Sequence, residues 1–162
     1  MSEPSHAASE PSVNSDFDYD FEKSIGYWTV LTSQAFQKAL NEELAPHGVT
    51  FRQSQVLGWL ALTGPLSQVE LASRMMIEPA TLVGVLDRMQ RDGLISRDPS
   101  SEDGRRKMIR VNPEAAEVWQ KVAQCARIVR ARATEGLTSR QVDQLMKLLR
   151  TVLQNLDGSA GR

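Results

Sequence analysis

The 162-residue chain has few of the residue types on which most catalytic and metal sites depend. It holds one Cys and two His, so no intrachain disulfide can form and no cluster with metal-ligand spacing occurs. The sequence also shows no phosphate-binding glycine loop and no nucleophile elbow. These absences argue against an enzyme, and they predict a protein without metal or cofactor.

Long apolar runs are absent as well. No stretch approaches the roughly 18 residues of a membrane span, and the first residues lack the basic-then-apolar pattern of a signal peptide. A single Cys agrees with a reducing compartment. We therefore expect a soluble, cytoplasmic protein with no membrane partner.

The net charge is −1, so the chain as a whole lacks the excess of basic residues that is common in nucleic-acid-binding proteins. The charge is nevertheless uneven: residues 1–22 hold six acids and no Lys or Arg, whereas residues 51–112 hold nine Lys or Arg against seven Asp or Glu. Four of those nine cations fall within residues 105–110. Because phosphate binding depends on where positive charge gathers, the total does not exclude DNA.

The middle of the chain has the clearest local signals. Ser67 and Glu70 have the spacing of a capping box, and Pro79 suits the first position of a second helix. Gly93 suits a left-handed cap after Asp92. The expected buried stripe of the second helix is Leu82, Val85, Leu86 and Met89. Two helices joined by a short break predict a helix-turn-helix, whose second helix enters the DNA major groove.

A β-hairpin is predicted directly after these helices. The segments 94–97 and 108–111 are typical of short strands, and Asp103-Gly104 between them is a strong turn signal. Arg105, Arg106 and Lys107 follow that turn. A basic hairpin beside a recognition helix predicts a winged helix, with one element in the major groove and the other along the backbone or minor groove.

At this point the sequence resembles a known family. Asp103-Gly104-Arg105, five residues and Val111-Asn112 resemble the wing signature of the MarR (multiple antibiotic resistance) regulators, which is Asp, any residue, Arg, five residues, then usually Leu-Thr. The resemblance covers roughly residues 20–156. Asn112 replaces the usual Thr, and like Thr it is expected to cap the helix that follows it. Gly104 stands where many members carry a second Arg. The resemblance implies a homodimeric repressor of pseudo-palindromic operators, relieved by a phenolic or aromatic carboxylate ligand.

Apolar periodicity outside the winged helix predicts further helices. One runs from Phe21 to Leu44, and two follow Asn112, with wider apolar faces than a small winged helix can cover. Thr138 and Gln141 have the spacing of a capping box at the start of the last helix. The expected buried stripe of that helix is Val142, Leu145, Leu149, Val152 and Leu156. We therefore expect a mainly α (α+β) protein in which N- and C-terminal helices form a dimer. The expected segments are a disordered acidic tail at 1–16, a dimerisation helix and loop at 17–49, the winged helix at 50–112, dimerisation helices at 113–157 and a flexible end at 158–162.

The candidate DNA contacts lie on three elements, and each has a structural alternative. They are Ser67 and Gln68 at one helix start, Ala80, Thr81, Gly84 and Arg88 on the recognition helix, and Arg105, Arg106 and Lys107 beside the wing turn Asp103-Gly104. Helix starts attract phosphate, but Ser67 and Gln68 also suit simple capping. Methyl groups at Ala80 and Thr81 suit thymine. A solvated charged hairpin is the alternative for the wing cations.

Gly84 is unusual because a glycine within a helix costs about 1 kcal/mol relative to Ala. Either a close approach to DNA or close packing against another helix would account for it. In the wing, the resemblance implies that Arg105 enters the minor groove. Arg106 and Lys107 are then expected to meet phosphates.

Three aromatic residues are candidates for an effector pocket. Tyr27, Trp28 and Trp59 are amphipathic groups that can line an apolar cleft, with Arg88 as a cation for an anionic ligand; a plain core role is the alternative. Cys125 lies on a helical stripe and is most simply a small buried residue, with redox sensing as the alternative. A second class of function is a helical dimer that binds a protein partner without binding DNA.

Overall fold

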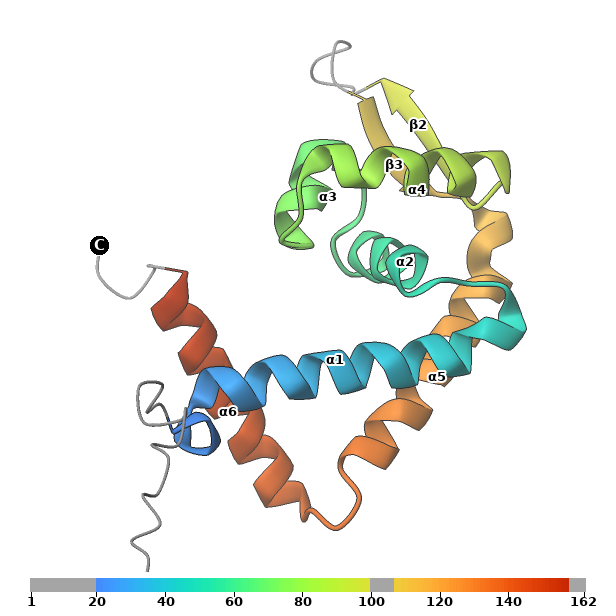
Figure 1. Ribbon diagram of the computed structural model, residues 1–162. Coiled ribbons are helices and arrows are strands. Elements are labelled where there is room, and N and C mark those ends of the chain that lie inside the picture. The colour runs from blue at the N-terminus through green and yellow to red at the C-terminus, as the bar shows by residue number, and fades with distance from the viewer. Residues whose placement is uncertain (1–19, 100–106, 158–162) are drawn as a thin grey trace, which may run out of the picture. The chain divides into compact units, whose positions relative to one another are not determined.

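The computed structural model describes residues 20–99 and 107–157 (Figure 1). The chain divides into two units, Met1–Ala35 and Phe36–Arg162. Helices dominate both units, and one small antiparallel sheet lies in the second, which confirms the expected fold class. The predicted tail, the hairpin tip at Asp103, Gly104, Arg105 and Arg106, and the last five residues lie outside the described residues.

The first long helix begins later than the sequence suggested. Phe21–Lys23 forms a separate 3-10 turn, η2, capped by the Asp20 side chain. Ser24 then adopts an extended conformation with φ −80° and ψ 120°, so the helix cannot pass through it. The helix α1 runs from Ile25 to Leu44. The prediction of one helix starting at Phe21 was therefore wrong by a turn.

Three helices and a three-stranded sheet make up the central domain (Figure 1). Its elements are α2 (Phe51–Thr63), β1 (Leu66–Ser67), α3 (Gln68–Arg74), α4 (Pro79–Arg91), β2 (Ile95–Pro99) and β3 (Lys107–Val111). The strand order is β1-β3-β2, and Ile109 pairs with Leu66 on one side and Arg97 on the other. The sequence did not reveal β1, because two residues are too few to show a strand period.

The buried face of α4 matches the predicted stripe. Leu82, Val85, Leu86 and Met89 are all buried, and they lie in one core with residues of α2, α3 and the sheet. Gly93 follows the helix with φ +73°, as expected for a left-handed cap. The core therefore fixes which side of α4 faces outward.

Asn112 has a different role from the one predicted. It precedes a 3-10 turn, η4 (Pro113–Ala115), and makes no side-chain cap. Its Nδ2 instead donates to the Gly93 carbonyl at 2.9 Å, and its backbone N–H donates to the Leu94 carbonyl at 3.0 Å. Asn112 thus ties the end of β3 to the end of α4, and the long helix α5 begins only at Ala116.

Helix α5 (Ala116–Ala133) is followed by α6 (Ser139–Leu156). The predicted capping box of Thr138 and Gln141 is present. The sequence predicted burial of Val142, Leu145, Leu149, Val152 and Leu156, yet no residue of α6 is buried in the single chain. One chain alone therefore leaves this apolar face exposed. None of the described helices is long and apolar enough to cross a membrane.

Cys125 is buried on α5, as the sequence suggested, with 2% of its surface exposed. Its Sγ–H donates to the Glu43 carbonyl oxygen at 3.3 Å, which links α5 to the end of α1. Burial raises the pKa of the Cys125 thiol above its ordinary value, and the Glu43 carboxylate raises that pKa further. A protonated, covered thiol is a poor nucleophile.

We expect iodoacetamide at pH 8 to alkylate Cys125 at least about tenfold more slowly in the native protein than in the urea-unfolded chain. Only the thiolate attacks iodoacetamide, and the raised pKa keeps the native thiol protonated. Since the folded-state pKa is raised, this thiol contributes stability below its unfolded pKa, and that contribution is lost as pH rises through the folded value. The measurement is alkylation followed by mass spectrometry. Equal rates in native and unfolded protein would contradict the assignment.

Candidate DNA-binding interface

The start of α3 is tightly hydrogen-bonded. The Ser67 hydroxyl lies 2.6 Å from Glu70 Oε2, and the Ser67 backbone N–H donates to the same oxygen at 2.8 Å. Ser67 is also 8% exposed. Both of its donors are thus used within the protein, which favours the capping interpretation of this residue over a DNA contact.

Gln68 connects the two helices of the helix-turn-helix. Its Nε2 donates to the Pro79 carbonyl at 2.9 Å, so the start of α3 is held against the start of α4. Pro79 occupies the first turn of α4 and Glu78 precedes it without a side-chain cap. This bond positions the first turn of α4, which is the part of a recognition helix that meets base edges.

The outward face of α4 carries the residues that the sequence pointed to. Ala80, Thr81, Gly84 and Arg88 are all exposed, on the side opposite the buried stripe. The first two turns of this face hold small side chains, and the cation Arg88 follows one turn later. Such an arrangement suits a helix that approaches DNA closely and holds phosphate farther along.

The wing strands are joined to α4 by an ion pair that sequence reasoning missed. Arg97 Nη1 on β2 lies 2.7 Å from Asp87 Oδ1 on α4. A second, longer pair joins Arg110 Nε to Asp98 Oδ2 at 3.7 Å across the hairpin. Opposite charges ten positions apart gave no local signal, because the turn between α4 and β2 brings Asp87 and Arg97 together. The first pair adds a polar contact between the wing and the recognition helix, whose relative position is set mainly by the core that Ile95 shares with Leu86.

The described end of the wing is basic. Lys107, the first residue of β3, is exposed. The remaining wing candidates Asp103, Gly104, Arg105 and Arg106 lie outside the described residues and stay predictions.

Within residues 20–99 and 107–157 no group of His, Cys, Asp and Glu could hold a metal ion.

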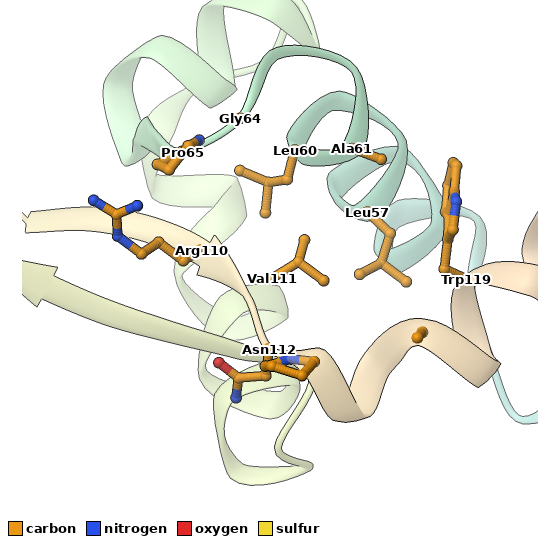
Figure 2. Close-up of a pocket in the computed structure, with 11 residues that line it drawn as sticks. Leu57, Leu60, Ala61, Gly64, Pro65, Arg110, Val111, Asn112 and Trp119 are labelled. Atoms are coloured by element: carbon orange, nitrogen blue, oxygen red, sulfur yellow. The ribbon is translucent and has the colours of Figure 1, made fainter.

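A pocket opens between α2, the end of β3 and the start of α5 (Figure 2). Its volume is about 480 Å³. The lining residues are Leu57, Leu60, Ala61, Gly64, Pro65, Arg110, Val111, Asn112, Pro113, Ala116 and Trp119. Figure 2 shows the Arg110 guanidinium and the Trp119 ring at opposite sides of an apolar centre. An apolar cavity with one cation at its edge suits an organic anion.

None of the three aromatic residues predicted to form a pocket lines this one, although Tyr27 lines a separate pocket within the N-terminal unit. Trp59 is half-buried against the core, and its ring lies 5.6 Å below the Arg74 guanidinium, which favours the core interpretation. Tyr27 and Trp28 pack edge to face at 5.4 Å, within the N-terminal unit. Trp119 was missed because its pocket partners come from three segments far apart in sequence.

Comparisons with known proteins find similarity to transcriptional regulators, in agreement with the helix-turn-helix and wing described above. A family model described as "MarR family" matches residues 47–106. The repressor IacR of Pseudomonas putida, described as an HTH-type transcriptional repressor, is 26% identical over 131 residues, which span 81% of this chain and 78% of that protein. The multiple antibiotic resistance protein MarR of Salmonella typhimurium is 27% identical over 130 residues, which span 80% of this chain and 90% of that protein.

The fold is also similar to that of a solved MarR structure. The crystal structure of a mutant MarR from E. coli complexed with operator DNA superimposes with a TM-score of 0.72 at 26% identity. The match covers 80% of this chain and 93% of that one. The likeness therefore extends well beyond the residues of the winged helix to helices on both sides of it.

Proposed function

We propose that this chain is a transcriptional regulator of the MarR family, which binds operator DNA as a homodimer and represses transcription. The observation that carries the proposal is the exposed, small-residue start of α4, which lies on a helix joined to the wing strand β2 by the Arg97–Asp87 pair at 2.7 Å. A DNA-binding regulator of this kind acts in the cytoplasm and carries no catalytic centre.

The DNA contacts are assigned by element. Ala80, Thr81 and Gly84 face base edges in the major groove, because the first turns of a recognition helix lie deepest there. Arg88 meets phosphate, and so does the start of α3 at the half-buried Gln68, where helix N–H groups favour anions. The wing residues Arg105, Arg106 and Lys107 contact the adjacent backbone or minor groove.

The dimer is assigned to the helices outside the winged helix. Residues exposed on α6 include Leu145, Leu148, Leu149 and Leu153, at 45%, 56%, 44% and 47%. On α1, Val30 and Phe36 are 55% and 41% exposed. Apolar faces this extended are rare on monomers and mark protein interfaces. A two-fold dimer would place two recognition helices in successive major grooves about 34 Å apart.

Relief of repression is assigned to the pocket of Figure 2. Its lining includes Arg110 and Asn112 of the β3 end and Trp119 of α5. An aromatic carboxylate would place its ring among the apolar residues and its charge beside Arg110. A ligand that binds better to one arrangement of wing and α5 shifts the protein toward that arrangement, and so changes DNA affinity.

A helical dimer that binds a protein partner without DNA remains the second candidate. The exposed apolar residues of α6 are compatible with this candidate, but they do not distinguish a different protein partner from a second copy of the chain. A salt-dependent shift of duplex DNA by the purified protein distinguishes the two candidates, since phosphate binding releases counterions and protein docking does not.

The first prediction concerns the wing. Lys107→Ala and Arg105→Ala should each weaken duplex binding and reduce the slope of log affinity against log salt by about one, because each removes one cation that displaces counterions from the duplex, Lys107 at a phosphate and Arg105 in the minor groove. The measurement is fluorescence anisotropy between about 50 and 200 mM salt. Lys121→Ala, an exposed cation on α5, is the control and should change neither quantity. Unchanged slopes in both wing variants would exclude the wing as a DNA contact.

The second prediction concerns the dimer. Leu149→Glu should shift the protein from two chains to one in sedimentation equilibrium, because a carboxylate buried at an interface loses its hydration without gaining a partner. Leu62→Glu is the matched control: Leu62 is 75% exposed at the end of α2, and the variant should remain dimeric. A wild-type protein that sediments as one chain would contradict the assignment.

The third prediction concerns the pocket. Salicylate at millimolar concentration should quench Trp fluorescence of the free protein and lower its DNA affinity. Arg110→Gln should weaken the fluorescence response about tenfold or more by removing the charge-assisted contact. Trp119→Phe should remove most of the response, whereas Trp59→Phe should retain it. A response that survives Trp119→Phe and disappears in Trp59→Phe would place the ligand elsewhere.

A further inference from the structure

We infer that the exposed face of α4 reads thymine methyl groups, and that Gly84 is the residue that lets the helix backbone approach them. The inference rests on the proposed function, since it assigns base specificity to a helix that the proposal places in the major groove. The evidence is the surroundings of Gly84, the chemistry of its neighbours on the helix and the partners of the nearby polar side chains.

Neither the backbone conformation at position 84 nor packing within the described residues requires a glycine there. Gly84 lies in the middle of the 13-residue helix α4, and it is not among the residues with positive φ. Among the residues that the structure describes, a Cβ added there would meet only Arg88 Nη1, at 3.8 Å, beyond the helix's own backbone and adjacent residues. That distance is an ordinary contact. Close packing against another helix of the chain, the alternative left open by the sequence, is therefore excluded within the described residues.

A glycine that weakens a helix without serving conformation or packing points to something outside the chain. Gly84 lies one turn after Ala80 and one turn before Arg88, so it occupies the centre of the exposed face. The groove-facing surface there is bare backbone. A base edge can approach such a surface more closely than one covered by a side chain.

The neighbouring side chains limit which base can be read. Ala80 and Thr81 offer methyl groups and one hydroxyl, and Val83 is 44% exposed beside them. The polar groups suited to bidentate readout of adenine or guanine are amides and guanidinium groups. Two nearby polar side chains are already engaged: Gln68 Nε2 donates to the Pro79 carbonyl at 2.9 Å, and Asp87 pairs with Arg97 at 2.7 Å.

The base feature that matches methyl groups and bare backbone is the C5 methyl of thymine, which is the one apolar group in the major groove. Arg88 then lies one turn farther along, where a cation meets phosphate. The competing assignment is that Gly84 makes room for Arg88 to fold back over the helix and bind guanine.

The first experiment removes the methyl groups from DNA. Bound duplexes are selected from a random library with the purified full-length protein, and each thymine of the recovered site is replaced in turn by deoxyuridine. We expect about a fourfold loss of affinity at one thymine of each half-site, and about fifteenfold when both symmetric methyl groups are removed. Replacing guanines by 7-deazaguanine should have little effect.

The outcomes separate the inference from the proposed function. If no duplex is selected, the proposed function fails and the inference fails with it. If a duplex is selected and deoxyuridine has no effect at any position, only the inference is overturned. If 7-deazaguanine is the substitution that matters and Arg88→Ala removes that effect, the guanine assignment replaces it.

The second experiment adds a methyl group to the protein. Gly84→Ala should raise the Tm by about 2 to 4 °C through helix propensity, while affinity for the selected duplex falls at least fivefold. Gly58→Ala is the matched control within α2, where an added Cβ would lie 4.0 Å from the Trp119 ring; it should raise the Tm without changing DNA affinity. Unchanged DNA affinity in a stabilised Gly84→Ala variant would overturn the inference.

Discussion

The burial of one face of α4 is the constraint on which the rest of the molecule depends. Leu82, Leu86 and Met89 are fully buried, so the opposite side of the helix has to face outward, whatever else the protein does. Leu, Leu and Met side chains of this kind contribute roughly 2 kcal/mol each on burial. That energy holds Ala80 and Gly84 at the surface, and a different register of the apolar stripe would display a different set of residues.

A second constraint is the junction at Asn112. Its two hydrogen bonds to Gly93 and Leu94 join the end of β3 to the end of α4, and the chain passes from there into α5. The pocket of Figure 2 lies against this junction. Asn112 thus links the wing, the recognition helix α4 and the chain that leads into α5. Because Asn112 also lines the pocket, a ligand bound there would contact the residue that joins the wing to α4.

Local signals were predictable from the sequence, and contacts between distant residues were not. The capping box of Ser67 and Glu70 and the stripe of α4 depend on residues three or four apart, so both were predicted correctly. Asn112 was assigned a cap because its actual partner, Gly93, lies 19 residues away. The pocket was missed for the same reason, since Leu57, Arg110 and Trp119 converge only after folding. The burial expected for α6 requires a second chain.

The central claim is that this protein is a two-fold winged-helix dimer that reads DNA with α4. Its most direct test is hydroxyl-radical footprinting of genomic fragments selected by the purified protein, combined with the mass of the complex. We predict inverted half-sites whose centres lie about one helical turn apart, or a multiple of it, on one face of the duplex, with two chains bound. A single protected half-site with one chain, or fragments without an inverted repeat, would contradict it.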